Sequence, residues 1–351
     1  MMDPIAVYIG DVFIYWSALI VALAVCAWFC LSAAVYTAGG GRAIAMWVFL
    51  PLAWGLGLLL SRALHWYCHT EQYVSLTGAL TDYAAGGYCM PGVLLGVVLA
   101  ARLLRLVRLI PSAARLLDAA APGAALGIAL IRLSALFNTT CRGSIIITDP
   151  SYQRLPLASP IITASGAAEY HFATFFVQFL LLLVLTVLLL VFHLRRSGRP
   201  MKCGPAAGHT ALLFLLLFSV TELVLDSTRY DSSFLRSNGF VSVVQICSAL
   251  CVLAVLVFYS VCSVRGNKLR WYHWLLWTGY LASVGGTGYL EYLVQRHGDW
   301  YLGCYGGMSA CCALMALTVY ILYRTVLSPK KEAAAAPQDA PVALTQADSP
   351  D

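Results

Sequence analysis

Residues 170–194 read YHFATFFVQFLLLLVLTVLLLVFHL and contain no Asp, Glu, Lys or Arg. The hydrocarbon core of a bilayer is about 30 Å thick, and about 20 apolar residues in helical form cross it. This stretch therefore predicts a transmembrane helix. The rest of the 351-residue chain is similar, because 60% of it is hydrophobic and only 11% is charged. A soluble domain carries roughly 25% charged residues, so the composition excludes that class of protein.

Eight more stretches of comparable length and apolarity lie along the chain. Together with the first, the predicted spans are 13–36, 44–65, 87–107, 113–137, 170–194, 207–226, 240–264, 271–292 and 303–326. They predict an all-α fold, a polytopic membrane helical bundle with about nine transmembrane helices. Residues 328–351 contain a Glu-Ala-Ala-Ala-Ala-Pro run without apolar periodicity and are predicted to form a disordered tail.

The distribution of Lys and Arg predicts the orientation of the bundle. Fifteen of the 22 basic residues fall in the connections on one side, and five fall on the other side. Positive charge accumulates on the cytoplasmic side of membrane proteins. We therefore expect a multi-pass plasma-membrane protein with its N-terminus outside and its C-terminus in the cytoplasm. The basic residues lie between apolar runs and form no large contiguous patch, which argues against nucleic-acid binding.

Some ionisable residues lie at membrane depth, where a charge costs roughly 2.5 kcal/mol or more. Arg132 lies about two-thirds through the fourth predicted span. Glu222 lies inside the sixth, and Asp226 follows it after one helical turn. Arg132 and Glu222 either pair with each other or face a polar cavity that binds a charged ligand, and the sequence leaves both interpretations open.

Other ionisable residues lie near the ends of predicted spans. Arg62 lies near the outer end of the second, and Glu169 and His171 open the fifth. We expect Asp118 to act as a helix cap near the inner start of the fourth span. We expect Glu291, near the outer end of the eighth, to reach the membrane interface. No C-x-x-C pair indicates a zinc or redox site, and we expect neither a metal nor a cofactor.

Two pairs of glycines four residues apart predict close helix packing. The pairs are Gly92 with Gly96 in the third span and Gly123 with Gly127 in the fourth. Small residues at this spacing let two helix backbones approach each other within a bilayer.

The fourth span carries a longer pattern, Asp118-x-x-Ala121-Pro122 followed by Gly127, Arg132 and Asn138. It comes after a glycine-rich element between Gly86 and Gly96. In this order the residues resemble prolipoprotein diacylglyceryl transferase, whose signature runs from an Asp through Ala-Pro to Gly-Arg-x-Gly-Asn-Phe.

Weaker similarities to the same family follow in order along residues 10–264. They are Arg62 at Gly-Arg-x-Gly-Tyr, His171 at His-Pro-Ser-x-x-Tyr-Glu, Asp226-x-x-Arg229-x-Asp231 at Glu-x-x-Arg, and Gln245-Ile-Cys-Ser248 at Gly-Gln-x-x-Ser. The resemblance implies a family-like membrane domain over residues 1–264. Residues 265–327 then add two transmembrane helices, and 328–351 form the cytoplasmic tail.

The resemblance also implies an activity, transfer of the diacylglyceryl group of a phospholipid to the cysteine of a lipoprotein signal peptide. The partners that the resemblance implies are a phosphatidylglycerol-like lipid and a prolipoprotein signal peptide. Guanidinium groups stabilise a departing phosphate, which is the role that the resemblance implies for Arg132, Arg229 and Arg62. The resemblance also implies that Asn138 binds the substrate. A thiol becomes nucleophilic on losing its proton, so the candidate catalytic residues are His171, Glu222 and Asp226.

The sequence departs from the family pattern at several polar positions. The family's His-Gly-Gly reads Pro91-Gly92-Val93, and the Asn that follows the family's arginine is lost in Ser134-Ala135-Leu136. These replacements favour an alternative, a catalytically degenerate member that binds lipid or a membrane partner without turnover. A third class, a small-solute transporter, predicts internal repeats, and the sequence shows no repeat at a fixed period.

Overall fold

The computed structural model describes residues 4–9, 12–73, 75–81, 87–138, 140–163, 166–196, 205–234, 239–298 and 300–327. The predicted tail, 328–351, lies outside the described residues. Within them, a long helix occupies each of the nine predicted spans. These helices are α1 (Trp16–Ala38), α2 (Ala43–Cys68), α4 (Met90–Leu106), α5 (Ala113–Leu133), α7 (Thr174–Arg196), α8 (His209–Leu225), α9 (Val243–Asn267), α10 (Trp271–His297) and α11 (Tyr301–Val326).

Six of these helices are long and apolar enough to cross a membrane: α1, α2, α5 with its 3-10 extension to Phe137, α7, α9 and α11. The prediction of a polytopic helical membrane protein is therefore confirmed. Helix α8 is apolar but has 17 residues, and α4 also has 17. That α4, α8 and α10 cross the membrane stays a prediction.

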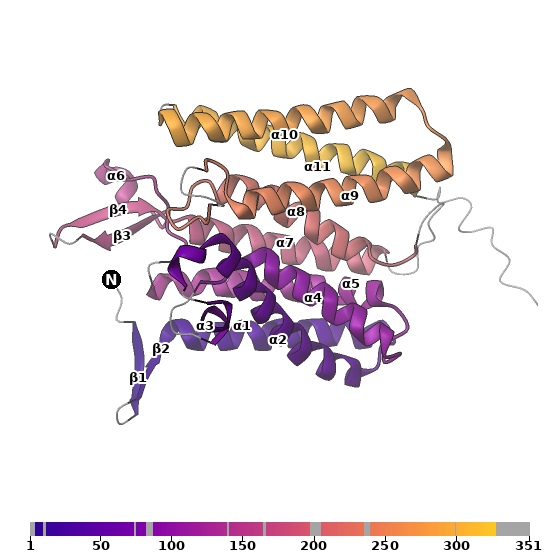
Figure 1. The fold of residues 1–351 in the computed structure, drawn as a ribbon, viewed down its shortest axis with the longest axis horizontal. Helices are drawn as coiled ribbons and strands as arrows, with labels where there is room; N and C mark the ends of the chain where they lie inside the picture. Colours follow the sequence, from indigo (N-terminus) through magenta and orange to yellow (C-terminus); the bar gives the residue numbers. More distant parts are fainter. Residues whose placement is uncertain are drawn as a thin grey trace, which may run out of the picture.

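The long helices lie side by side with roughly aligned axes (Figure 1). Helices α1 and α2 form one flank, α10 and α11 form the other, and α5, α7 and α8 lie between them. The N-terminal hairpin, a second hairpin and the short helices α3 (Leu76–Thr81) and α6 (Pro150–Gln153) lie toward one end of the bundle. We call that end the outer end, after the orientation that the charge distribution predicts.

Two antiparallel hairpins precede long helices, and their second strands include residues 13–15 and 170–172, where helix was expected. Strands β1 (Ile5–Ile9) and β2 (Val12–Tyr15) precede α1, and β3 (Ala158–Ile162) and β4 (Ala168–Phe172) precede α7. His171 pairs with Ser159 in the second hairpin, so the prediction that Glu169 and His171 open a helix was wrong. The strand pairing satisfies backbone groups that an isolated extended segment would leave unpaired.

The two glycine pairs lie at close contacts between helices, as predicted. A Cβ atom on Gly92 would lie 2.5 Å from Cα of Ser61, and one on Gly96 would lie 2.4 Å from the backbone nitrogen of Gly57. In the same way Gly123 and Gly127 face α1, around Trp28. Side chains at these positions would push α4 away from α2 and α5 away from α1.

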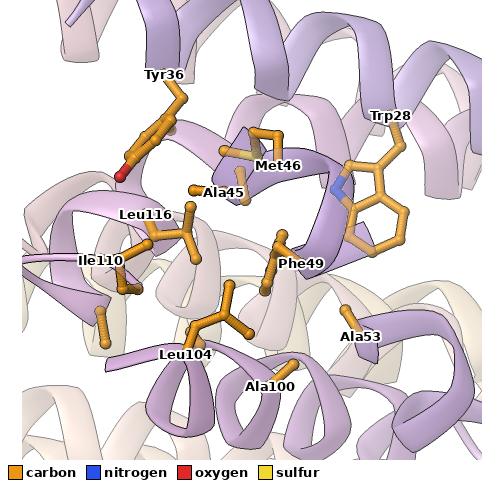
Figure 2. Close-up of a cluster of buried hydrophobic side chains, with 14 residues drawn as sticks. Trp28, Tyr36, Ala45, Met46, Phe49, Ala53, Ala100, Leu104, Ile110 and Leu116 are labelled. Atoms are coloured by element: carbon orange, nitrogen blue, oxygen red, sulfur yellow. The ribbon is translucent and has the colours of Figure 1, made fainter. Parts of the chain in front are cut away.

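A cluster of buried apolar side chains joins these four helices (Figure 2). Trp28 of α1 and Phe49 of α2 meet edge to face, with ring centroids 6.4 Å apart. Leu104 of α4 and Leu116 of α5 are fully buried beside them. This packing fixes the position of α5, the helix that carries Arg132 to the outer end of the bundle.

Asp118 caps a helix, but not its own. From α5 its carboxylate accepts hydrogen bonds from the backbone N–H groups of Gly208 and Ala211, at the start of α8. The first N–H groups of a helix have no partner within that helix, and a carboxylate also interacts favourably with the helix dipole there. Asp118 therefore ties α5 to α8 at the inner end.

Glu291 is buried rather than at the membrane interface, which corrects the expectation from the sequence. Its residue is 2% exposed, and its Oε1 accepts a hydrogen bond from Gln295. Its other polar neighbours are Ser227 and Gln245, at the outer ends of α8 and α9. The side chain therefore points into the bundle, where α10 meets the rest of the molecule.

Candidate functional site

Arg132 and Glu222 form a buried ion pair near the outer ends of α5 and α8. Their Nη2 and Oε2 atoms lie 3.5 Å apart, and the side chains are 11% and 3% exposed. Gln178 of α7 donates from Nε2 to both carboxylate oxygens, at 3.1 and 3.2 Å. The structure therefore agrees with the first of the two interpretations left open by the sequence, in which Arg132 and Glu222 pair with each other.

The pair still leaves polar atoms unsatisfied. In the part of the chain that the structure describes, Arg132 Nε and Gln178 Oε1 are buried without a hydrogen-bond partner. A buried donor or acceptor of this kind costs about 1–3 kcal/mol, so a ligand that supplies the missing partner gains that free energy on binding. The site thus has one open donor and one open acceptor.

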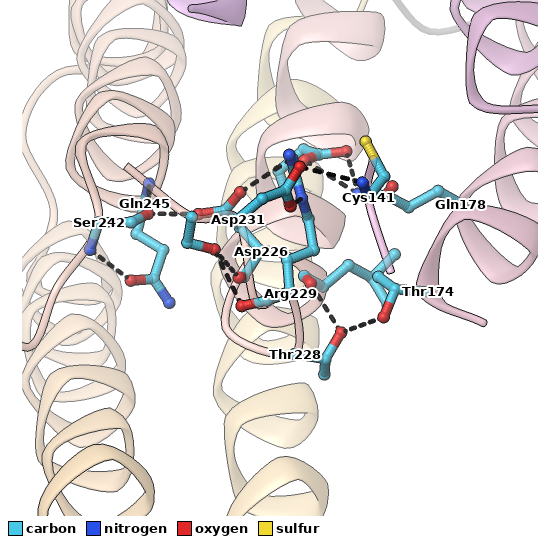
Figure 3. Close-up of polar contacts among 12 residues, drawn as sticks. Cys141, Thr174, Gln178, Asp226, Thr228, Arg229, Asp231, Ser242 and Gln245 are labelled. Carbon is cyan, nitrogen blue, oxygen red and sulfur yellow. Dashed lines mark hydrogen bonds and ion pairs between the residues drawn. The ribbon is translucent and has the colours of Figure 1, made fainter. Parts of the chain in front are cut away.

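A second polar cluster lies in the turn that follows α8 (Figure 3). Arg229 Nη1 lies 3.2 Å from Asp226 Oδ1, and Arg229 Nε lies 2.9 Å from Asp231 Oδ1. Asp226 also accepts a hydrogen bond from the hydroxyl of Ser242, the residue that caps α9. Gln245 completes this cap and donates to the carbonyl of Leu223. The turn is therefore held against the start of α9.

Cys141 connects the two clusters. Arg132 Nη1 donates to its sulfur at 2.9 Å, and its backbone N–H donates to Asp231 Oδ2 at 3.0 Å. Its backbone φ of 56° lies in the left-handed region, which is uncommon for a residue other than glycine. The loop after α5 therefore turns sharply here and places the thiol between the two ion-pair clusters.

The start of α7 fixes the same loop from the other side. Phe175 donates its backbone N–H to the carbonyl of Cys141, and the hydroxyls of Thr174 and Thr228 lie 2.8 Å apart. Thr174 is fully buried. Helices α5, α7 and α8 thus all contribute to one cluster, and its geometry depends on their packing.

The cluster nearly balances its own charge, with two guanidinium groups against the carboxylates of Glu222, Asp226 and Asp231. Burial alone would raise the pKa of Asp231, but the hydrogen bond and positive charge of Arg229 outweigh burial and hold the pKa below its ordinary value. Asp231 is therefore ionised at neutral pH.

Of the seven residues predicted for the site, the structure brings together Arg132, Glu222, Asp226 and Arg229. His171 lies in β4, where its Nδ1 is 3.0 Å from the carbonyl oxygen of Gly143 and its Nε2 is 3.6 Å from Glu169 Oε2. Gly143 in turn forms a backbone bridge with Arg229. His171 is thus one strand away from the cluster.

Arg62 and Asn138 make other contacts. Arg62 is 2% exposed, donates to the carbonyls of Ala79 and Gly87, and lies between the rings of Tyr73 and Tyr88. It therefore organises the connection between α2 and α4. The side-chain oxygen of Asn138 accepts hydrogen bonds from the N–H and hydroxyl of Thr140, which shapes the loop before Cys141.

Cys141 and Gln178 were missed by the sequence analysis. Neither carries a full charge, and Cys141 lies in an outer connection rather than in an apolar run. Gln178 did leave a signal, because it is the only amide side chain in the quoted stretch 170–194. Within the described residues, no group of three or more His, Cys, Asp or Glu side chains is arranged to hold a metal ion.

The family model described as prolipoprotein diacylglyceryl transferase matches residues 4–261. The chain belongs to this family. The match confirms the resemblance seen in the sequence and supports a diacylglyceryl-transferase-like function in lipoprotein biosynthesis at a membrane. No curated protein matches the chain.

The prolipoprotein diacylglyceryl transferase match covers the whole site and ends in α9. Arg132, Cys141, Gln178, Glu222 and the turn 226–231 all lie within it. Helices α10 and α11 lie beyond it, although Glu291 of α10 reaches the outer end of α9. The matched region therefore contains the site but not α10 and α11.

Proposed function

We propose that this protein transfers a diacylglyceryl group from an anionic phosphoglycerolipid of the phosphatidylglycerol type to the cysteine thiol of a lipoprotein signal peptide. The observation that carries the proposal is the unsatisfied Nε donor of Arg132, buried in the same cluster as Arg229. A phosphate oxygen satisfies such a donor and forms strong charge-assisted hydrogen bonds with guanidinium groups.

The reaction needs two things from these residues, a proton acceptor for the thiol and positive charge for the leaving group. The thiol proton passes to a carboxylate, which we assign to Glu222, with Asp226 as the neighbouring alternative. The sulfur then forms a bond to the terminal glyceryl carbon, and the bond from that carbon to the phosphate oxygen breaks. Glycerol phosphate leaves with the electron pair, and Arg132 and Arg229 stabilise its charge.

The other predicted residues take supporting roles in this proposal. His171 positions the loop at Gly143 beside Arg229, and Asn138 shapes the loop that presents Cys141. Arg62 holds the connection between α2 and α4 at the outer end of the bundle. The site faces the outer side of a plasma membrane, in keeping with the predicted orientation.

The test is transfer in vesicles of phosphatidylcholine that contain phosphatidylglycerol with labelled acyl chains. The purified protein is incubated with a peptide that carries a signal-peptide cysteine, and the labelled peptide is measured by mass spectrometry. We expect transfer with the unchanged protein and a loss of about 100-fold or more for Arg132→Gln and Arg229→Gln. Arg154→Gln, an exposed outer arginine, is the matched control. Absence of transfer by the unchanged protein would overturn the proposal.

A second candidate, a lipid-binding protein without turnover, is favoured by one observation. The structure has Pro91 in the first turn of α4, where the resemblance places a histidine, so no imidazole is present there. This candidate predicts that phosphatidylglycerol co-purifies with the protein and is lost in Arg132→Gln, while the peptide is never labelled.

A further inference from the structure

An apolar groove runs between α9 and α10 on the flank farthest from α1 and α2. Helix α10 packs along α11, and α11 packs on α9 (Figure 1). The groove has a volume of about 520 Å³. It is lined by Leu253, Leu256, Val257, Ser260, Val261, Val264 and Arg265 of α9 and by Trp277, Tyr280 and Leu281 of α10.

The polar atoms in the groove wall have partners within the protein, with one exception at its end. Trp277 donates its indole N–H to the hydroxyl of Ser260 at 2.9 Å, and Tyr280 donates to the carbonyl of Ala249 at 3.0 Å. The remaining wall is aliphatic. Water therefore gains nothing by filling the groove, and the bilayer offers one apolar occupant, an acyl chain.

The length of the groove matches one leaflet of a bilayer. Leu253 and Arg265 are twelve residues apart on α9, which corresponds to about 18 Å along the helix axis. Half of the hydrocarbon core measures about 15 Å. An acyl chain whose free end lies near Leu253 therefore has its head group at the depth of Arg265.

Arg265 supplies a positive charge at that end. It is exposed, and within the described part of the chain it has neither a hydrogen bond nor an ion pair. Lys268 and Arg270 follow in the same connection. Basic residues at this depth attract anionic head groups of the cytoplasmic leaflet.

We propose that the groove binds one acyl chain of an anionic phospholipid from the cytoplasmic leaflet, with the lipid phosphate held by Arg265. This lipid site is separate from the cluster around Arg132. Ser242, which contacts that cluster, lies 23 residues from Arg265 along α9, or about 34 Å. The proposal does not rest on the transfer activity, and α10, which contributes three of the ten lining residues, lies outside the family match.

The test measures lipid retention by native mass spectrometry after reconstitution in vesicles of equal parts phosphatidylglycerol and phosphatidylcholine with identical chains. Val257→Trp fills the groove, and Leu250→Trp is its control, because both residues are exposed on α9 but Leu250 does not line the groove. We expect Val257→Trp to retain one lipid fewer than Leu250→Trp. Equal retention by these two variants overturns the proposal.

The head-group assignment has its own pair of variants. Arg265→Gln should lower the preference for phosphatidylglycerol over phosphatidylcholine at this site by about fivefold. Arg195→Gln, an exposed arginine at the inner end of α7, should leave the preference unchanged. Retention of phosphatidylcholine as strongly as phosphatidylglycerol by the unchanged protein overturns the anionic assignment.

A photoactivatable phosphatidylglycerol with a diazirine on its acyl chain gives a readout on the unmodified protein. We expect covalent labelling of peptides that contain residues 253–265 and 277–281. Labelling spread evenly over exposed residues of α1 and α7, with no enrichment in these two segments, overturns the groove as a binding site.

Discussion

The buried pair of Arg132 and Glu222 makes a quantitative prediction about stability. Glu222→Gln keeps the shape of the side chain but leaves the Arg132 guanidinium without its counter-charge. Removing one partner of a buried ion pair costs about 3–5 kcal/mol, because the remaining charge stays desolvated. The side chains are 3% and 11% exposed, so solvent screens this charge little. We therefore expect Glu222→Gln to lower the free energy of unfolding by about 4 kcal/mol.

Thermal unfolding in detergent micelles, followed by near-ultraviolet circular dichroism, measures this effect. An unfolding entropy of about 2.1 cal/mol/K per residue over 351 residues converts about 4 kcal/mol into a fall in Tm of about 5 °C. The double variant Glu222→Gln with Arg132→Met has no unpaired charge. Replacing both partners of a buried pair is often close to neutral, so we expect this variant to regain most of the lost Tm.

Glu169→Gln serves as the control, because the side chain of Glu169 is 48% exposed and its partner is a histidine. Its Tm should stay within about 1 °C of the unchanged protein, as expected for an exposed pair. The reasoning is refuted if Glu222→Gln shifts Tm no more than Glu169→Gln does. It is also refuted if the double variant is less stable than either single variant.

Three further predictions concern the packing and the polar contacts around this site. Gly96→Ala places a methyl group 2.4 Å from the backbone of Gly57 and should cost about 1–3 kcal/mol in thermal unfolding, whereas Gly55→Ala points into open space and should cost nothing measurable. Asp118→Ala leaves two backbone N–H groups at the start of α8 without an acceptor, which should cost about 1–3 kcal/mol and speed hydrogen exchange of those amides. Asp231 has a lowered pKa, so its stabilising contribution is complete above its unfolded pKa of about 3.8 and is lost as the pH falls through the lower folded value. The Tm difference between the unchanged protein and Asp231→Asn should therefore shrink below about pH 4.

The helices could be predicted because the bilayer constrains them strongly. Every backbone group in hydrocarbon needs an internal partner, so a long apolar run has almost no alternative to helix. The sequence constrains the hairpin before α7 less strongly. Residues 168–172 read AEYHF, and five residues of mixed polarity next to an apolar run carry too short a pattern to separate strand from helix. Their state depends on pairing with 158–162, which is tertiary information.

The site residues also differ in how far the sequence could predict them. Arg132 and Glu222 could be predicted because a full charge at membrane depth needs a reason. Cys141 and Gln178 carry no such cost in the sequence, and their roles depend on the packing of α5 against α7. Glu291 shows the limit of the reasoning from depth alone. Its position near a helix end allowed the side chain to reach water, but the helix rotation directs it inward.

The start of α4 narrows the choice of a base for the proposed transfer. Pro91 lies in the first helical turn, where a backbone N–H would have no intrahelical partner, so a proline at the position where the resemblance expects a histidine leaves the helix intact. Gly92 beside it touches the backbone of Ser61, which keeps this end of α4 in place. In the proposed transfer the proton acceptor is therefore assigned to the polar cluster around Arg132, whose buried carboxylates include Glu222 and Asp226.

Glu222 is the better placed of the two, because it also pairs with the arginine assigned to the phosphate. In the proposed transfer Glu222 accepts the thiol proton, so it loses its negative charge and its attraction to Arg132 weakens. The guanidinium is then free to follow the charge that develops on the departing phosphate. One contact of 3.5 Å would thus couple proton removal to leaving-group stabilisation. On this mechanism Glu222→Gln abolishes transfer but keeps phosphatidylglycerol bound to Arg132, whereas in a lipid-binding protein without turnover the unchanged protein and the variant are alike in both measurements.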